Sequence, residues 1–165
     1  MKKIIVIGAP GSGKSTFALK LGNKLDIPVY HLDKIWWKGD WENVTREEFD
    51  KRLAEIVNKK RWIIDGNYRR TLDIRLKECD TVVYLDYNGF YCMLNALIRC
   101  FRNRGKVRKD MGGNCIEKFD LDFIKYIVTF NRRERSDIYR SLENYKGELH
   151  IFRRRRKLNK WLDIL

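Results

Sequence analysis

The segment from residue 8 to residue 15, Gly-Ala-Pro-Gly-Ser-Gly-Lys-Ser, has side chains and a spacing suited to binding a polyphosphate. It fits the pattern G-x-x-x-x-G-K-[ST], in which glycines let successive backbone N–H groups approach phosphate oxygens. Lys14 adds a positive charge, and the hydroxyl of Ser15 is a suitable ligand for the Mg²⁺ that accompanies a nucleoside triphosphate. The residues expected to hold this ligand are Gly8, Pro10, Gly11, Ser12, Gly13, Lys14, Ser15 and Thr16.

The flanking residues supply the elements that must position this loop. Residues 3–7 form a short apolar run, typical of a buried parallel strand, and apolar side chains at 17, 18, 21 and 25 follow helical spacing. A helix that begins near Gly13 directs the positive end of its dipole at the bound anion. Strand, loop and helix together favour a nucleotide-binding loop over a glycine turn that binds nothing.

The composition indicates one globular domain over residues 1–165 with anionic partners. The chain has 36 Lys and Arg against 22 Asp and Glu, a net charge of +14, which suits nucleotides, nucleic acid or both. Its 4 cysteines include no C-x-x-C pair, so neither structural zinc nor a disulfide scaffold is expected. Because no leader segment and no run of about 18 apolar residues occurs, we expect a cytoplasmic protein without membrane contact.

Apolar runs alternate with helical patterns along the whole chain, which predicts an α/β fold. The expected strands cover residues 3–7, 27–32, 62–66, 81–86 and 148–152. Strands that alternate with helices imply a parallel sheet with helices on both faces, a three-layer arrangement.

Acidic residues stand at the carboxyl ends of three of these strands, where ligands bind in open parallel sheets. Asp33 could face an acceptor molecule or a magnesium-bound water, although a helix-capping role is the alternative. Asp65 is the preferred partner of Mg²⁺, together with Ser15, because a glycine follows it directly; Asp86 is the second candidate.

The segment of about residues 33–60 is the expected acceptor side. Trp36, Trp37 and Trp41 fall on what we interpret as a loop, either as a stacking wall for a flat ligand or as a small hydrophobic cluster. Arg69 or Arg70 could hold an anionic group of the acceptor, or either could be solvated. The expected acceptor-binding residues are Asp33, Trp37, Asp65, Gly66, Tyr68 and Arg69.

Basic residues crowd into the stretch from 99 to 109, which suggests an arginine-rich lid over about residues 102–116. Arginines on a lid can stabilise the charge of a transferring phosphoryl group, and Arg135 on the next helical segment could reach the same phosphates. A solvated basic face or a nucleic-acid patch is the alternative for the lid. The same alternatives hold for the basic run at residues 153–157.

Taken together, these motifs resemble the adenylate-kinase-related family called DNA topology modulation proteins, over nearly the whole chain. The similar blocks are the loop at 8–15, Trp-Ile-Ile-Asp-Gly-Asn-Tyr at 62–68, Arg-Lys-Asp-Met at 108–111, His-Leu-Asp at 31–33 with Trp37 and Trp41, Tyr-Leu-Asp at 84–86 and Phe-Asp at 119–120. The block beginning at Asp65 stands where adenylate kinases carry Asp-Gly-Phe-Pro-Arg.

The resemblance implies a nucleoside-monophosphate-kinase-like P-loop fold with a five-stranded parallel sheet, and ATP and Mg²⁺ as ligands. It also implies that Arg99, Arg108 and Arg135 act on the phosphates. Related kinases tend to carry arginines four residues apart before the lid, whereas here Asn95 stands four residues before Arg99. The family name further implies an effect on DNA topology.

Three hypotheses follow from the sequence. The first is an ATP-dependent phosphotransferase acting on a small acceptor such as a nucleotide, with Lys14, Arg99, Arg108, Arg135 and Asp33 as its catalytic residues. The second is an ATP-binding protein that acts on DNA through its basic segments. The third is an ATP-binding module without turnover. The chain is expected to be a monomer or a homodimer.

Overall fold

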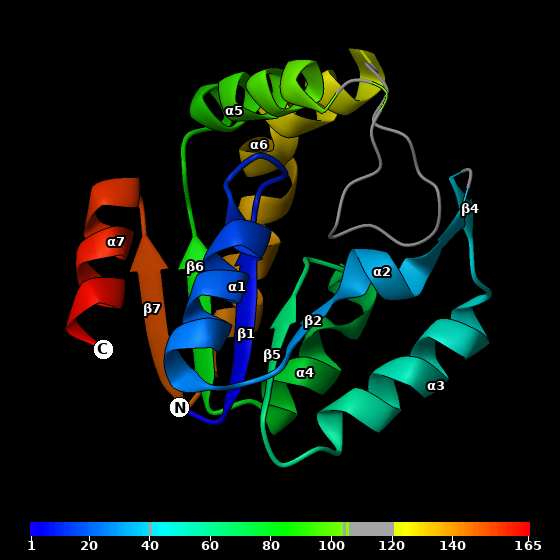
Figure 1. The fold of residues 1–165 in the computed structure, drawn as a ribbon, viewed down its shortest axis with the longest axis vertical. Coiled ribbons are helices and arrows are strands. Elements are labelled where there is room, and N and C mark those ends of the chain that lie inside the picture. Colours follow the sequence, from blue (N-terminus) through cyan, green and yellow to red (C-terminus); the bar gives the residue numbers. More distant parts are fainter. Residues whose placement is uncertain (40, 104, 106–120) are drawn as a thin grey trace.

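A five-stranded parallel sheet forms the centre of the computed structural model, which describes residues 1–39, 41–103, 105 and 121–165. The strand order is β2-β5-β1-β6-β7, and all arrows point the same way in Figure 1. The strands are β1 (Lys3–Gly8), β2 (Val29–His31), β5 (Trp62–Asp65), β6 (Thr81–Leu85) and β7 (Glu148–Phe152). The predicted α/β class with a five-stranded parallel sheet is therefore confirmed.

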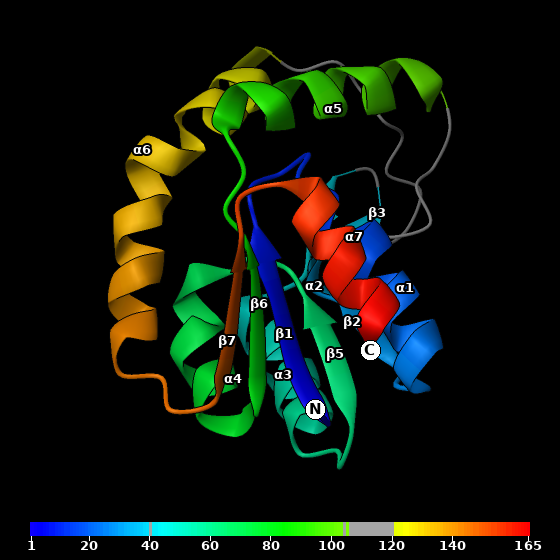
Figure 2. The ribbon, with the colours of Figure 1, turned by 90° about the vertical axis from the view of Figure 1, so that its left-hand side faces the viewer.

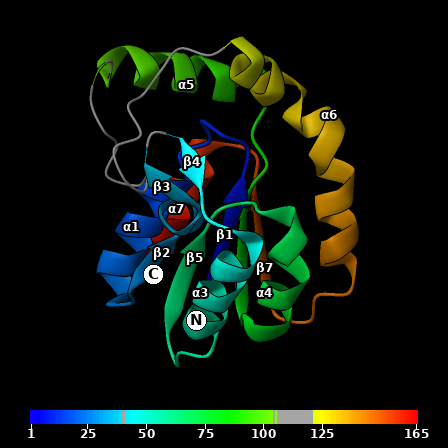
Figure 3. The ribbon, with the colours of Figure 1, turned by 90° about the vertical axis from the view of Figure 1, so that its right-hand side faces the viewer.

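Helices cover both faces of the sheet (Figures 2 and 3). One face carries α1 (Lys14–Leu25) and α7 (Arg155–Ile164), and the other carries α4 (Leu72–Glu78) and α6 (Leu121–Glu143). The helix α5 (Gly89–Arg102) runs across the carboxyl ends of the strands. The side chains of residues 4–7, 62–64 and 82–85 are at most 1% exposed, because both faces of the sheet are covered.

The order of the strands places the predicted loop between two candidate acids. β1 pairs with β5 on one side, with Val6 opposite Asp65, and with β6 on the other, with Gly8 opposite Leu85. Asp86 directly follows β6. The strand that ends at Asp65 therefore lies directly beside the strand that precedes the loop.

The stretch expected as a loop over residues 34–41 has regular structure instead. It contains α2 (Leu32–Trp36) and an antiparallel pair made by β3 (Trp37–Gly39) and β4 (Glu42–Asn43). Trp36 packs edge-on against Phe49 and Tyr68, at ring-centroid distances of 5.5 and 6.0 Å. The apolar contacts that order this stretch come from α3 (Arg46–Val57) and from the connection after β5, which local spacing does not reveal.

A side-chain cap from Thr45 lies at the start of α3. The backbone N–H of Glu48 donates to Oγ1 of Thr45 over 3.2 Å. This cap satisfies an N–H group that has no acceptor inside the helix, so it fixes where the acceptor-side helix begins.

The helix α5 buries small side chains and leaves its large ones outside. Gly89, Cys92 and Ala96 are buried, whereas Phe90 and Phe101 are 62% and 72% exposed. The helix lies so close to the loop that a Cβ on Gly11 would stand 2.1 Å from the carbonyl oxygen of Cys92.

On α6, the apolar residues at 127, 130, 138 and 142 are buried, whereas Phe123 and Val128 are exposed. Across the described ranges, no helix combines the length and apolar character needed to span a bilayer.

Candidate active site

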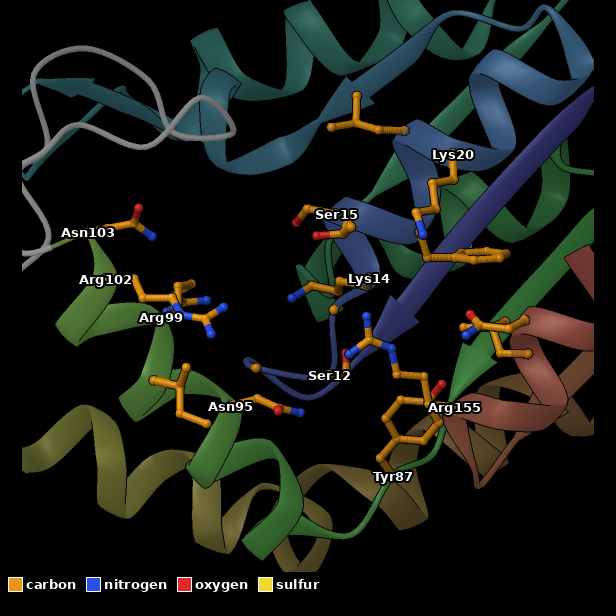
Figure 4. Close-up of a pocket in the computed structure, with 18 residues that line it drawn as sticks. Ser12, Lys14, Ser15, Lys20, Tyr87, Asn95, Arg99, Arg102, Asn103 and Arg155 are labelled. Carbon is orange, nitrogen blue, oxygen red and sulfur yellow. The ribbon is translucent and has the colours of Figure 1, made fainter.

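The loop between β1 and α1 opens into a pocket of about 700 Å³ (Figure 4). Gly11 and Gly13 take left-handed backbone conformations, with φ of +80° and +86°. The first helical hydrogen bond of α1 is donated by the backbone N–H of Phe17 to Gly13 O over 2.9 Å. The N–H groups of residues 14–16 therefore have no acceptor within the helix and are available to an anion.

The pocket is strongly positive. Its lining includes Lys14, Lys20, Arg99, Arg102 and Arg155 and contains no aspartate or glutamate among the described residues. These cations come from α1, α5 and α7, and in Figure 4 Lys14 and Arg99 point toward each other across the open space. Cations on several sides of one cavity suit a ligand with several negative charges.

The rest of the lining is apolar or neutral and could hold the base and sugar of a nucleotide. Tyr87, Ile98 and Leu158 supply apolar surface, and Asn159 supplies an amide. Sequence reasoning missed these residues as a group, as well as Lys20, Asn103 and the role of Arg155. One signal was present for Arg155, because it follows the last parallel strand at the carboxyl edge where ligands bind.

The predicted nucleotide-binding residues separate into two groups. Residues 11–16 line the pocket, and Arg99 lies opposite them. Gly8 and Pro10 are not part of the lining. Gly8 is instead held by the side-chain amide of Asn67, which accepts from Gly8 N over 2.9 Å and donates to Gly8 O over 2.8 Å. Most of the predicted lid, including Arg108, lies outside the described residues, as does the Phe-Asp pair at 119–120.

Asp65 lies beside β1, with its side chain 4% exposed. Its Oδ2 is 2.8 Å from Nδ1 of His31, and its buried Oδ1 has no hydrogen-bond partner among the described residues. An unsatisfied carboxylate oxygen at this edge fits the acceptor of a hydrogen bond from a magnesium-bound water. Among the described residues, no three or more His, Cys, Asp or Glu side chains form a group that could hold a metal ion.

Asp86, the second candidate for the magnesium site, binds cationic and phenolic groups of the protein. Its Oδ2 accepts from Nη2 of Arg135 over 2.8 Å and from the hydroxyl of Tyr139 over 3.0 Å, and Nε of Arg153 lies 3.5 Å away. The hydrogen bond to Asp86 raises the pKa of Arg135 above its usual value. Arg135 does not line the pocket, so the structure does not bring it together with Arg99.

On the acceptor side, Asp33 lies in the first turn of α2 and accepts a hydrogen bond from the hydroxyl of Tyr68 over 2.9 Å. Burial, and then the charge of Asp33, raise the pKa of Tyr68 far above its usual value, so the phenol keeps its proton and remains the donor. Tyr68 also stacks on Phe49, with ring centroids 5.1 Å apart. The N-cap of α2 is His31 and the helix has no side-chain cap hydrogen bond, so Asp33 is not its cap and instead has Tyr68 as a side-chain partner.

The two arginines expected near the acceptor form ion pairs with the protein. Arg69 Nη1 lies 2.6 Å from Oδ2 of Asp137, and Arg70 binds both carboxylate oxygens of Asp50.

Two further positions of the acceptor side have partners within the fold. A Cβ on Gly66 would stand 2.9 Å from Cβ of Leu32, so packing explains that glycine. Trp37 packs edge-on against Trp41, with ring centroids 5.4 Å apart.

Comparisons with known proteins give one related sequence and several related folds. A scan against protein families finds none that matches the chain. The adenylate kinase of Mycoplasma mobile is 32% identical over 78 residues, which are 47% of this chain and 35% of the relative. The chain thus spans about a third of the length of this curated relative.

Two solved shikimate kinases match almost the whole chain. The enzyme from Bacteroides thetaiotaomicron has a TM-score of 0.59 and 15% identity, covering 98% of this chain and 94% of its own. The enzyme from Acinetobacter baumannii, solved in complex with shikimate, has a TM-score of 0.58 and 18% identity, covering 99% and 92%. These likenesses show that the chain has the nucleoside-monophosphate-kinase-like P-loop fold that was predicted.

Proposed function

We propose that this protein is an ATP-dependent phosphotransferase that moves the γ-phosphoryl group of ATP to a small acceptor. One observation carries the proposal. The open amides at the start of α1 share a pocket with five cationic side chains and no carboxylate among the described residues. Kinases also recur among the related sequence and folds, and the shikimate kinases are named for a small acceptor.

The phosphates of ATP would bind to the backbone N–H groups of Gly11 and residues 13–15 and to Lys14, whereas the N–H of Ser12 donates to Ala9 O over 3.1 Å. Ser15, which lines the pocket, would bind Mg²⁺ directly through its hydroxyl, and Asp65, which does not line it, would act through water at its unpartnered Oδ1. The metal would neutralise part of the phosphate charge. Arg99, which faces Lys14 in Figure 4, would stabilise the charge that develops on the transferring group. Arg108 remains a predicted partner of that group, whereas Arg135 would first have to exchange its bond to Asp86.

The acceptor would bind on the side of β2 and β5, where Asp33 can accept a hydrogen bond from an acceptor hydroxyl. The fixed phenol of Tyr68 would orient this carboxylate, and Trp37 would provide a flat contact. Arg69 could bind an acceptor anion by exchanging its bond to Asp137. A nucleotide or another hydroxylated, anionic metabolite fits these groups.

The test compares Lys14→Ala with Lys51→Ala, a change of an exposed lysine on α3. Binding of Mg·ATP is measured by calorimetry, and ADP release is measured with a panel of nucleoside monophosphates and small hydroxylated metabolites. Loss of one charge-assisted contact should weaken ATP binding about 10- to 100-fold in Lys14→Ala only. Equal affinity in both variants would contradict the proposal, and tight ATP binding without acceptor-stimulated ADP release would indicate a module without turnover.

An ATP-binding protein that acts on DNA is the second candidate. It is favoured by the exposed cations Arg154, Arg156 and Lys157. They belong to the same basic run as Arg155 but, unlike Arg155, do not line the pocket. Contacts with several DNA phosphates would make the logarithm of the affinity fall with the logarithm of salt, with a slope of about −0.9 per phosphate. ATP binding at a single loop should show a shallower slope, and a DNA affinity that is insensitive to salt would speak against this candidate.

A further inference from the structure

A completely buried arginine, Arg75 on α4, lies behind the candidate site. Its side chain is 0% exposed, and the hydrogen-bond acceptors of its guanidinium are backbone carbonyls. Burial lowers its pKa to about 10, which still leaves the group charged at neutral pH. A buried charge is costly unless its donors are satisfied, so the carbonyls that surround it are a specific feature of the fold.

The four carbonyls belong to one short segment, the connection that follows β5. Arg75 donates to Gly66 O over 2.9 Å, to Asn67 O over 2.5 Å, to Tyr68 O over 3.1 Å and to Thr71 O over 3.3 Å. Tyr68 has φ of +28°, a conformation that side chains rarely adopt and that persists only where the surroundings impose it. The guanidinium is one of the groups that impose it.

The same segment carries a contact to each half of the candidate site. The amide of Asn67 binds both backbone polar groups of Gly8, the first residue of the phosphate-binding loop. The hydroxyl of Tyr68 binds Asp33 on the acceptor side. Arg75 therefore holds the backbone of the two residues whose side chains reach the nucleotide loop and the acceptor acid.

We propose that Arg75 is a positioning residue that sets the phosphate-binding loop and Asp33 relative to each other, acting through Asn67 and Tyr68. The inference rests on the proposed function and adds to it the residue that aligns donor and acceptor. Arg75 is not part of the pocket lining, so it would act through Asn67 and Tyr68. The planar guanidinium, with its five donors, can reach carbonyls on several successive residues, whereas the single ammonium of lysine cannot reach all of them.

The experiment uses Arg75→Met, Arg75→Lys, Asn67→Ala and the Arg75→Met/Asn67→Ala double variant. The matched control is Arg52→Met, because Arg52 is an exposed arginine on α3 that pairs with Glu48. Thermal unfolding first establishes that each variant is folded. Binding of Mg·ATP is then measured by calorimetry, and exchange of the Gly8 amide hydrogen is measured by NMR.

Loss of the two bonds to Gly8 should weaken ATP binding about 5- to 30-fold in Asn67→Ala, with faster exchange of the Gly8 amide. Arg75→Met should act in the same direction, and Arg75→Lys should not restore the affinity. The double variant should have about the same affinity for ATP as whichever single variant binds ATP less tightly. Both changes interrupt the same series of contacts, from Arg75 through Asn67 to Gly8, so their effects should not add. A purely structural Arg75 would lower the unfolding temperature but leave affinity and exchange unchanged in the folded protein.

The outcomes separate this inference from the proposed function. If the wild-type protein does not bind Mg·ATP, the proposed function fails, while faster Gly8 exchange in Arg75→Met still supports positioning of the loop. If the wild type binds ATP but folded Arg75→Met keeps its affinity and exchange rate, the inference is overturned. Should both Arg75 variants fail to fold, unchanged binding and exchange in Asn67→Ala would overturn it.

Discussion

Replacing Gly11 by alanine tests whether α5 is packed against the phosphate-binding loop. The backbone of Gly11 has φ of +80°, and a Cβ there would stand 2.1 Å from the carbonyl oxygen of Cys92 and 3.2 Å from Cβ of Ala96. Gly13 has nearly the same backbone conformation, with φ of +86°, but its Cβ would meet nothing within 4 Å. Gly13→Ala is therefore a control that carries the backbone strain without the collision.

The expected loss of stability differs between the two variants. A left-handed conformation costs a residue other than glycine about 1–2 kcal/mol, a term that both alanines share. The collision with Cys92 involves backbone and cannot be relieved by turning a side chain, so an overpacking cost of about 1–3 kcal/mol is added for Gly11→Ala. The free energy of unfolding should fall by about 2–5 kcal/mol in Gly11→Ala and by about 1–2 kcal/mol in Gly13→Ala.

Urea unfolding of the wild type and both variants, without nucleotide, measures these differences. The slope of the unfolding free energy against urea should remain similar, because the surface exposed on unfolding is unchanged. Equal losses in the two variants would refute the reasoning, since they would show that α5 does not approach the loop at Gly11. Arg99 and Arg102, which are on this helix, would then lack the support that places them in the pocket.

The carboxylates of Asp86 and Asp80 give two further predictions. Asp86→Asn removes the charge that binds Arg135 and Tyr139, so thermal or urea unfolding should show a loss of about 1.5–3 kcal/mol. An unchanged stability would mean that these two bonds make no net contribution to the folded state. At Asp80, burial acts to raise the pKa, but hydrogen bonds from Thr81 and from two backbone N–H groups outweigh it and hold the pKa below 3.8. The stabilising contribution of Asp80 is therefore present above about pH 4 and is lost as the pH falls through the lowered pKa. The Asp80→Asn variant should be less stable than the wild type at neutral pH, and its free energy of unfolding should change less between about pH 4 and pH 2. Urea unfolding across that pH range measures both differences. The same acid-range slope in both proteins would contradict this assignment.

The strands and the nucleotide loop were predictable because the signals that produce them are local. A continuous apolar run is required where a strand is covered on both faces, and the expected strand at residues 3–7 coincides with β1, which is buried from residue 4 to residue 8. The glycines at 11 and 13 were expected for their backbone freedom, and both have positive φ. In contrast, the helix and hairpin between residues 32 and 43 depend on Trp36 reaching Phe49 and Tyr68, contacts that the local pattern does not contain.

The site was predictable where a motif defines it and not where distant side chains meet. The loop and Arg99 were expected, and they line one pocket. Arg135 was expected near the phosphates because sequence shows an arginine but not its partner, and in the structure Asp86 binds it. The exposed apolar side of α5 was also not predictable from local spacing. The helix turns its small residues toward the loop so that it can pack closely against it, and its large apolar residues therefore face outward.

The sequence alone determined the phosphate-binding loop, the alternation of strands and helices, and the acids at the carboxyl ends of the strands. Each depends on residues that are neighbours along the chain, and backbone sterics and hydrophobic spacing act at that range. Only the tertiary structure decided which charges face the pocket and which are paired or buried. The sequence shows Arg75, Arg135 and Arg155 as equal cations, but the fold buries the first among carbonyls, pairs the second with Asp86 and turns the third toward the nucleotide loop. The energy of a charge depends on what surrounds it in three dimensions, so these roles are decided only when the chain has folded.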